Sequence, residues 1–299
     1  MPVTLIAGGT GFIGSHLARR LAARGHEVRI LSRSAKPNAE HKVFVWDVVK
    51  QTIDDAAFAG VDYVINLAGA GIVGKRWSEA RKEVIIKSRT DSTLLLARSM
   101  ARLGVQPKLY LNASAVGYYG DRGTELMTET ADPGIGFLSK SCILWEESVA
   151  EVDLLKIPTF IARTGIVLHP DEGALEKMLI SLNLWVSTYF GDGSQVYSWI
   201  HIEDMVGIYL HAIENDLTGI YNAVAPNPAT NKELAAGLGP ALGKSTLVLP
   251  TPAFVMKLAM GEMSHTVLDS ARCASTKIEA AGYRFEHPEL AGALTDLLG

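Results

Sequence analysis

The chain has 299 residues, of which 48% are hydrophobic and 20% are charged, as in a globular protein large enough to bury a substantial core. Its formal net charge of -4, with no basic run, argues against a nucleic-acid binder. The two cysteines, Cys142 and Cys273, belong to no Cys/His cluster, so neither a disulfide framework nor a metal site is indicated. No signal peptide and no apolar stretch long enough to span a membrane are evident, which predicts a cytoplasmic protein.

The first predicted strand, residues 2–7, leads into a glycine-rich turn at residues 8–14 (GGTGFIG) and then a helix at residues 15–24. This order of elements presents a dinucleotide pyrophosphate to a helix N-terminus. The glycines fit two templates, G-x-G-x-x-G from Gly9 and G-x-x-G-x-x-G from Gly8. The alternative is a plain tight turn between strand and helix. We predict a nucleotide site that includes Gly8, Thr10, Gly11, Phe12, Ile13 and Gly14.

The second predicted strand, residues 27–33, indicates which dinucleotide is bound. An NAD site carries an acidic residue at the end of this strand, where it holds the ribose 2′-hydroxyl. Here the strand ends in Ser32, Arg33 and Ser34. A guanidinium and two hydroxyls suit a 2′-phosphate, because charge-assisted hydrogen bonds form to its oxygens. We therefore predict NADP(H) in preference to NAD(H); the alternative is that Arg33 is an ordinary solvated charge.

Further strands are predicted at residues 42–47, 61–69, 109–114, 160–168 and 219–224, and helical stretches separate the earlier ones. Strands that alternate with helices indicate an α/β fold with a parallel, doubly wound sheet. The end of the third strand places Asp47 near the adenine. The small residues that follow the fourth strand, Leu67, Ala68 and Gly69, let the backbone lie under a ribose or nicotinamide.

From about residue 173 the alternation loosens, and the tail after residue 230 is mostly helical, with a break at residues 247–250. We expect these late parts to form a smaller substrate lobe over the carboxyl ends of the strands, where ligands of such sheets bind. The predicted division is a nucleotide-binding domain at residues 1–225, with residues 170–200 contributing to the lobe, and a small C-terminal domain at residues 245–297.

Several motifs resemble the extended short-chain dehydrogenases/reductases of the NAD-dependent epimerase/dehydratase superfamily. They are residues 8–14 (GGTGFIG), 66–69 (NLAG), Ser114 ahead of 118–121 (YYGD), and 199–205 (WIHIEDM). Others resemble its branch of "epimerase family proteins", which includes the animal SDR family 39U member and carries a C-terminal domain of unknown function: residues 75–77 (KRW), 114–120 (SAVGYYG), 145–147 (WEE), 163–168 (RTGIVL) and 279–285 (EAAGYRF). The resemblance covers the whole chain and implies a Rossmann fold that binds a nicotinamide dinucleotide.

The chain departs from this family at its catalytic pair. Short-chain dehydrogenases use Tyr-x-x-x-Lys on one helix face, where the lysine lowers the pKa of the tyrosine that exchanges a proton. Counting back from Glu146 places Leu138 at the tyrosine position and Cys142 at the lysine position. No tyrosine in the chain is followed by lysine four residues later. The ordinary pair is therefore absent.

Replacements for the pair are predicted near the fifth strand. Ser114 lies four residues before Tyr118, the spacing at which the resemblance implies the catalytic serine or threonine; the alternative is that its hydroxyl only satisfies backbone groups at the strand end. Tyr118 offers a phenol as a proton donor; the alternative is that its ring only packs within the loop. Lys140 reads as a surface charge, and Cys142 as an inert buried thiol or a reactive one. Around these we predict further cofactor contacts from Leu67, Ala68, Gly69, Arg89, Ala113, Ser114, Cys142 and Thr164.

Arginines and aromatic residues above the cofactor are predicted to contact the substrate: Arg76, Trp77, Tyr119 and Trp199. An arginine there clamps a carboxylate or phosphate, unless it only pairs with surface carboxylates. His201 is a candidate acid or base, although the family resemblance implies that its segment mainly docks the late lobe onto the sheet.

Three functions follow. The leading one is an NADP(H)-dependent oxidoreductase that acts on a small polar carbonyl or alcohol with a non-standard proton donor. The loss of the Tyr/Lys pair supports a non-catalytic NADP(H)-binding regulatory protein instead. Nucleotide-sugar epimerisation ranks lower because it needs the missing tyrosine. We expect a small-molecule substrate, a monomer or homodimer, and neither a nucleic-acid nor a membrane partner.

Overall fold

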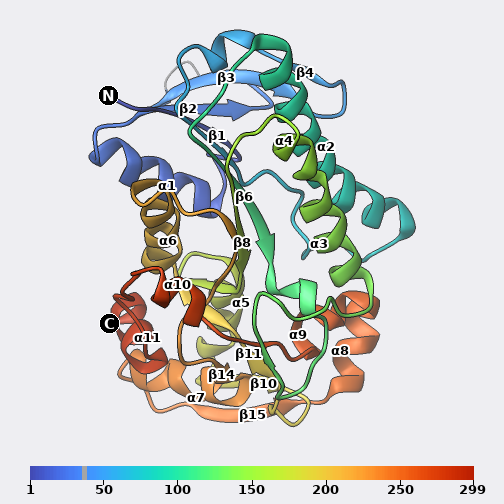
Figure 1. The fold of residues 1–299 in the computed structure, drawn as a ribbon. Coiled ribbons are helices and arrows are strands. Elements are labelled where there is room, and N and C mark those ends of the chain that lie inside the picture. Colours follow the sequence, from blue (N-terminus) through green and yellow to red (C-terminus); the bar gives the residue numbers. More distant parts are fainter. Residues whose placement is uncertain (36–38) are drawn as a thin grey trace.

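An eight-stranded sheet organises the chain (Figure 1), and the computed structural model describes residues 1–35 and 39–299. Neighbouring strands are parallel except for the short last one, which runs antiparallel to β3. In spatial order the strands are β13 (Gly219–Ala223), β8 (Thr159–Thr164), β6 (Leu109–Ala115), β5 (Tyr63–Asn66), β1 (Val3–Ala7), β2 (Glu27–Ser32), β3 (Lys42–Asp47) and β4 (Thr52–Ile53).

Helices cover both faces of this sheet (Figure 1). One face packs against α1 (Phe12–Ala23) and α6 (Ile202–Glu214), and the other against α2 (Glu79–Leu103), α3 (Phe137–Ser148) and α4 (Ala150–Asp153). Side chains alternate between the two cores along each strand, so Ile6 belongs to the first core while Leu5 and Ala7 belong to the second. The predicted doubly wound Rossmann fold is confirmed.

The strand order reverses beside β1. The chain proceeds from β1 through β2 to β3 on one side, then returns to β5 on the other side and continues outward to β6, β8 and β13. Loops that leave β1 and β5 in opposite directions open a crevice at their carboxyl ends, which is where open α/β sheets bind ligands.

The prediction of one strand over residues 160–168 was wrong. The chain breaks at Gly165 into β8 and β9 (Ile166–His169), and β9 leaves the main sheet to pair with β12 (Trp199–His201). A Cβ atom at position 165 would lie 2.3 Å from the Ser198 carbonyl oxygen, so only glycine allows the two segments to approach this closely. This long-range contact is not visible in the local sequence pattern.

The remaining elements form the late lobe, at the bottom of Figure 1. Its own core includes Leu168, Leu234 and Leu294. Strand β15 pairs in parallel with β10, at the predicted break in the helical tail. The elements are α5 (Gly173–Leu182), β10 (Val186–Phe190), β11 (Val196–Tyr197), β14 (Ala229–Thr230), α7 (Asn231–Ala241), β15 (Leu247–Thr251), α8 (Ala253–Met260), η3 (Gly261–Ser264), α9 (His265–Leu268), α10 (Thr276–Ala280) and α11 (Leu290–Leu298).

Four short elements complete the description: η1 (Asp55–Phe58), η2 (Val116–Tyr119), and β7 (Leu126–Met127), which pairs in parallel with β16 (Arg272–Cys273). The C-terminal tail also returns to the first domain. Ile278 and Tyr283 are buried in the core under α1 and α6, and the buried Asp204 carboxylate accepts hydrogen bonds from the Tyr283 hydroxyl and the backbone N–H of Glu286. Within the described residues, no helix combines the length and apolar character that crossing a membrane requires.

Candidate functional site

The glycine turn after β1 is held in one conformation by its neighbours. The Gly11 N–H donates to the Gly8 carbonyl over 3.0 Å, and Gly8 has a φ of +82°. A Cβ atom at Gly14 would lie 2.2 Å from the Gly8 carbonyl oxygen, and one at Gly8 would lie 2.8 Å from the Leu67 backbone. Glycine is therefore required at both positions, and the spacing that closes the turn is Gly8, Gly11 and Gly14.

Helix α1 begins at this turn without a side-chain cap. Its N-cap residue is Gly11, so no side chain accepts the first free backbone N–H groups of Phe12 and Ile13. Such N–H groups and the positive end of the helix dipole attract an anion. Thr10 is exposed beside them. The turn and helix N-terminus therefore have the donor set that a pyrophosphate needs.

The ends of β2 and β3 lie at the same edge of the sheet. Ser32 is buried, whereas Arg33 and Ser34 are exposed. The Asp47 carboxylate accepts hydrogen bonds from the backbone N–H groups of Val49 and Lys50, both at 3.0 Å. Asp47 thus shapes its own turn beyond β3, while Arg33 stays available for a ligand at this edge.

The backbone after β5 lies directly against the glycine turn. The carbonyl carbon of Leu67 and the nitrogen of Ala68 are in contact with Gly8. The Arg89 guanidinium of α2 covers Gly69, where a Cβ atom would be 3.0 Å from Cζ. Arg89 donates to the carbonyl oxygens of Ala70 and Ile85 and lies over the Trp145 ring at 5.0 Å. Burial lowers the pKa of Arg89, because the guanidinium is taken out of water.

A cavity of about 220 Å³ opens beside Arg89, at the carboxyl ends of β6 and β8. Its walls come from the sheet edge, from α3 and from α9. Of the predicted site residues, Arg89, Cys142 and Thr164 line it, and Ala115 continues the wall that Ala113 and Ser114 begin in β6. The cavity therefore joins the nucleotide edge of the sheet to the late lobe.

Leu138 and Cys142 both face this cavity from α3. The predicted helix register is thus the one that the structure adopts, and the two positions of the usual catalytic pair carry an apolar side chain and a thiol. Burial raises the pKa of the Cys142 thiol to about 12, so the group stays protonated and weakly nucleophilic near neutral pH. Lys140, on the same helix, is exposed.

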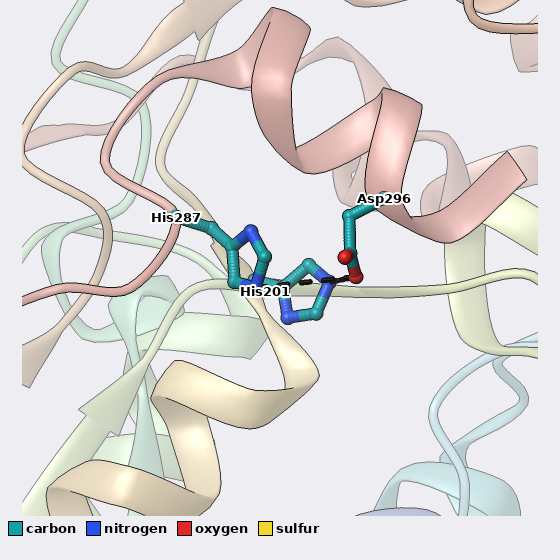
Figure 2. Close-up of side chains that lie close together, drawn as sticks. All are labelled: His201, His287 and Asp296. Atoms are coloured by element: carbon teal, nitrogen blue, oxygen red, sulfur yellow. Dashed lines mark ion pairs between the residues drawn. The ribbon is translucent and has the colours of Figure 1, made fainter. Parts of the chain in front are cut away.

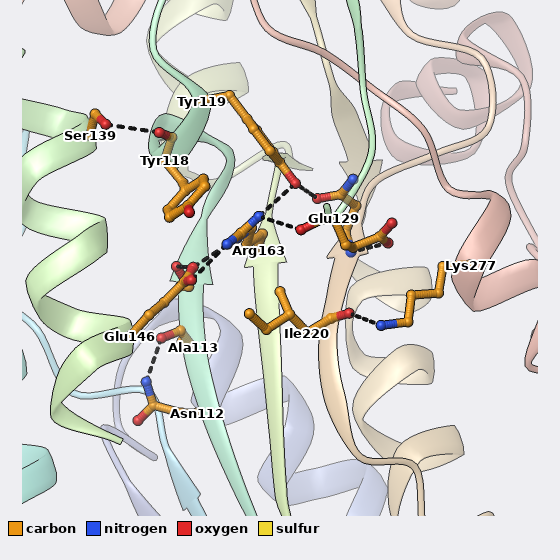
Figure 3. Close-up of polar contacts among 12 residues, drawn as sticks. Asn112, Ala113, Tyr118, Tyr119, Glu129, Ser139, Glu146, Arg163, Ile220 and Lys277 are labelled. Atoms are coloured by element: carbon orange, nitrogen blue, oxygen red, sulfur yellow. Dashed lines mark hydrogen bonds and ion pairs between the residues drawn. The ribbon is translucent and has the colours of Figure 1, made fainter. Parts of the chain in front are cut away.

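Ser114 is engaged in a buried polar network with Glu146 and Arg163, of which Figure 3 labels the latter two. Its hydroxyl donates to Glu146 Oε1 over 2.6 Å. Arg163 of β8 forms two hydrogen bonds of 2.8 Å to the same carboxylate, and only 2% of its side chain is exposed. Although burial alone would lower the pKa of Arg163, the hydrogen bonds and charge of Glu146 raise it, so the guanidinium stays charged.

Both predicted tyrosines join this network and do not line the cavity. The Tyr118 ring lies against the Arg163 guanidinium at 3.4 Å, and the buried Tyr119 hydroxyl donates to Asn222 over 2.7 Å (Figure 3). Burial raises the pKa of Tyr119. The structure therefore places Ser114, Tyr118 and Tyr119 in a polar network at the sheet edge, in which Tyr118 is half-buried, and none of the three lines the cavity.

The other predicted substrate residues make contacts within the protein: Trp77 and Trp199 are buried, whereas Arg76 is exposed. Arg76 donates to the carbonyl oxygens of Leu258 and Ala259, which ties α8 to the segment before α2. Trp77 is buried against Phe137, with ring centroids 4.8 Å apart. Trp199 is fully buried in the core of the late lobe, and its indole N–H donates to the Asn227 carbonyl. These contacts engage all three side chains within the fold, and their predicted substrate contacts stay predictions.

His201, His287 and Asp296 meet where the late lobe contacts α6 (Figure 2). The imidazole rings stack at 3.8 Å, and His201 Nε2 lies 3.3 Å from Asp296 Oδ2. His201 Nδ1 accepts the Glu203 backbone N–H, so the proton of the neutral ring is on Nε2, where a metal ligand would need a lone pair. Burial, and then His287, lower the pKa of His201. The cluster docks α11 onto the first domain and does not suit a metal ion.

One pair on the cavity wall was not predicted. His265 of α9 and Asp269, the residue that follows this helix, both line the cavity, and His265 Nδ1 lies 2.7 Å from Asp269 Oδ1. Their spacing of four residues is visible in the sequence, but the packing that brings α9 to the cavity is not.

A Rossmann sheet, a glycine cradle at its reversal point and an uncapped helix N-terminus define a class of proteins that hold a nucleotide at this edge. The chain belongs to the NAD dependent epimerase/dehydratase family, which residues 4–136 match, and carries the C-terminal domain of unknown function DUF1731 at residues 251–297.

Similar proteins match over nearly the full chain. The human epimerase family protein SDR39U1 is 34% identical over 302 residues, covering 98% of this chain and 99% of that protein. The epimerase family protein YfhF of Bacillus subtilis is 34% identical over 296 residues, covering 98% and 97%. A crystal structure of human SDR39U1 (isoform 2) with NADPH superposes with a TM-score of 0.88 at 32% identity, covering 99% of both chains. The predicted family is confirmed.

Proposed function

We propose that this protein is an NADP(H)-dependent oxidoreductase that acts on a small carbonyl or alcohol. The observation that carries the proposal is the cavity of about 220 Å³ beside Arg89, whose guanidinium also covers Gly69 next to the glycine cradle. The reactive end of a dinucleotide and a substrate of a few heavy atoms would meet in this cavity.

The residues present fit a nicotinamide dinucleotide. The free N–H groups at the start of α1 and the cradle of Gly8, Gly11 and Gly14 would hold the pyrophosphate. The backbone of Leu67 and Ala68 would lie under the ribose. The remaining predicted contacts, Arg89, Cys142 and Thr164, would enclose the nicotinamide end of the dinucleotide. When bound, the reduced nicotinamide supplies a hydride to a carbonyl carbon. The chain itself positions that end against the cavity and excludes water with Leu138, Cys142 and Trp145.

NADP(H) is favoured over NAD(H) by the exposed Arg33 and Ser34 at the end of β2, with no carboxylate in that position. The human relative with NADPH supports the same preference. A UDP-glucose 4-epimerase of Thermus thermophilus in complex with NAD shares only the fold, at 21% identity and a TM-score of 0.75. The preference for NADP(H) therefore rests on Arg33 and Ser34, which directly follow β2.

Intrinsic tryptophan fluorescence tests the cofactor, because Trp145 lines the cavity. We expect NADPH to bind at least about 10-fold more tightly than NADH, the effect of one to two charge-assisted hydrogen bonds. Arg33→Ala should remove most of this difference, whereas Arg98→Ala, a change of another exposed arginine, should not. Equal weak binding of both dinucleotides would contradict the proposal.

Turnover is tested by the loss of NADPH absorbance with a panel of small aldehydes, ketones and keto acids. The second candidate is a non-catalytic NADP(H)-binding regulatory protein, favoured by Leu138 and Cys142 in place of Tyr and Lys. Tight NADPH binding without oxidation across the panel would support it. A nucleotide-sugar epimerase is less well supported, because no tyrosine lines the cavity from α3. Cytoplasmic location and a monomeric or homodimeric state stay predictions.

A further inference from the structure

The side chains that α3 contributes to the cavity, among them Leu138, Ser141 and Cys142, include no acid that titrates near neutral pH, because burial raises the pKa of the Cys142 thiol to about 12. A reduction of a carbonyl group still requires a proton for its oxygen. Another wall of the cavity offers His265 of α9 and Asp269, which directly follows this helix. No other histidine lines the cavity in the part of the chain that the structure describes.

Packing places this pair opposite α3. Met263, two residues before His265, belongs to one apolar cluster with Leu138 and Phe137. Lys82 of α2 pairs with Glu262 at 2.6 Å, and the Tyr197 hydroxyl donates to the Val267 carbonyl over 2.6 Å. In Figure 1, α8 and α9 lie next to the lower end of α3. His265 is thus held against the helix that carries the catalytic tyrosine in relatives with the usual pair.

The hydrogen bond between His265 and Asp269 determines which nitrogen of the imidazole ring is free to exchange a proton with a ligand. Nδ1 donates its proton to Asp269 Oδ1 over 2.7 Å, which leaves Nε2 for a ligand. Asp269 is partly buried, and burial raises the pKa of its carboxyl, an effect that Asp121 on the adjoining loop increases and that His265 opposes. The other ionisable groups that line the same cavity are Arg89, Cys142 and Tyr197. Burial raises the pKa of Tyr197, and its hydroxyl is engaged by the Val267 carbonyl. The His265 side chain is exposed on its outer side, and the Asp269 carboxylate is the more buried partner of the pair.

We propose that His265 donates and accepts the proton of the reaction and that Asp269 is the positioning residue that orients its ring; this inference rests on the proposed function. In the reductive direction the carbonyl carbon accepts a hydride from NADPH, and the π electrons of the C=O bond move to the oxygen. That oxygen takes the proton from Nε2, so the products are the alcohol, NADP⁺ and the neutral imidazole. The reverse reaction returns the proton to Nε2.

A first experiment does not depend on turnover. Diethyl pyrocarbonate modifies histidine rings, and mass spectrometry gives a separate rate for each histidine. We expect saturating NADPH to slow the modification of His265 at least about 10-fold, because a dinucleotide in the cavity would cover the ring on its wall, while His287, which stacks on His201 outside the cavity lining, reacts at an unchanged rate. Full binding of NADPH by fluorescence without protection of His265 would overturn the inference and leave the cofactor assignment intact.

The second experiment uses any carbonyl compound that the panel shows to be reduced. His265→Gln should lower kcat by about 100-fold or more, the usual contribution of a general acid, with the Kd for NADPH within twofold of the wild type. Asp269→Asn should lower kcat by about 10-fold and change its pH profile, since the ring remains but is oriented differently. His287→Gln is the matched control and should change neither.

The outcomes separate the two proposals. A wild-type enzyme that reduces a carbonyl compound and a His265→Gln variant with unchanged kcat would overturn the role of His265 while the oxidoreductase function stands. A failure of NADPH binding, or binding without turnover of any compound, would overturn the oxidoreductase function and the proton transfer with it.

Discussion

The Ser114 hydroxyl donates to Glu146 across 2.6 Å, and the same carboxylate holds the buried Arg163 by two hydrogen bonds. The serine that would position a substrate oxygen in relatives with the usual pair is thus occupied within the fold. Glu146 supports the ends of β6 and β8 together, and these strand ends form one wall of the cavity. We therefore expect the network of Ser114, Glu146 and Arg163 mainly to stabilise the fold and, through the two strand ends, to maintain the shape of the cavity.

Glu146→Ala should destabilise the protein by about 3–5 kcal/mol, because it leaves the Arg163 guanidinium buried without a partner. The free energy of unfolding from urea denaturation checks this. Glu147→Ala, at an exposed neighbour on α3, is the control and should cost less than about 1 kcal/mol. The double variant Glu146→Leu, Arg163→Met should recover much of the loss. A loss below 1 kcal/mol in the single variant would show that the pair is replaceable.

Neither cysteine of the native protein should react with Ellman's reagent at pH 8. Burial raises the pKa of Cys142 and of Cys273 to about 12, so the thiolate fraction is very small. Absorbance at the released thionitrobenzoate band should stay flat for minutes and then rise by two equivalents on addition of urea, since the chain has two cysteines. Rapid release of one equivalent from the native protein would reveal an activated thiol at the cavity.

Gly14→Ala should abolish tight NADPH binding. The new Cβ would lie 2.2 Å from the Gly8 carbonyl oxygen, so the turn must shift and its N–H groups no longer converge. We expect the Kd to rise by at least about 10-fold, the loss of one or more charge-assisted hydrogen bonds. Gly292→Ala in α11, where a Cβ meets no atom within 4 Å, is the matched control. An unchanged affinity in Gly14→Ala would place the dinucleotide elsewhere.

Stability should fall as the pH drops below neutrality, in part through His201. Burial and His287 lower the pKa of His201 in the folded protein below its ordinary 6.5, so the unfolded chain binds the proton more readily. The stability that the neutral ring contributes is complete above pH 6.5 and is lost as the pH falls through the lowered value. His16 and His26 act in the same direction, because burial also lowers their pKa.

The variant His201→Asn isolates this contribution, since asparagine keeps an N-cap for α6 but does not titrate. Urea denaturation at pH 7.5 and pH 5.0 should show a smaller difference in the free energy of unfolding for this variant than for the wild type. His287→Gln keeps His201 and should retain most of the pH dependence. Equal pH dependence in His201→Asn and wild type would assign the effect to the other histidines.

The sequence predicts the sheet and the glycine turn because both depend on local patterns. Strands β1, β2 and β3 lie within a residue or two of their predicted positions, and the helix register at Leu138 and Cys142 also follows from nearby residues. The break at Gly165 was missed because its cause is the Ser198 carbonyl, 33 positions along the chain. Local pattern is informative where the neighbours that decide a conformation are also neighbours in sequence.

The environment of the predicted site residues also depends on contacts between distant parts of the chain. The sequence suggests that Trp77 and Trp199 face a ligand, but each indole N–H donates to a backbone carbonyl and each ring packs in an apolar cluster that only the fold brings together. His265 and Asp269 carry a visible spacing of four residues, yet their position at the cavity depends on the packing of η3 against α3. The chemistry of a side chain is readable from sequence, whereas its exposure is not.

The return of the C-terminal tail to the first domain affects how this chain is made. Ile278 and Tyr283 complete the core under α1 and α6, and Asp204 is satisfied only when Tyr283 and Glu286 reach it. During synthesis, the core under α1 and α6 therefore stays incomplete until residues 278–286 have left the ribosome. A nascent chain halted near residue 225 would expose an apolar face and an unpartnered buried carboxylate, which makes it a substrate for chaperones.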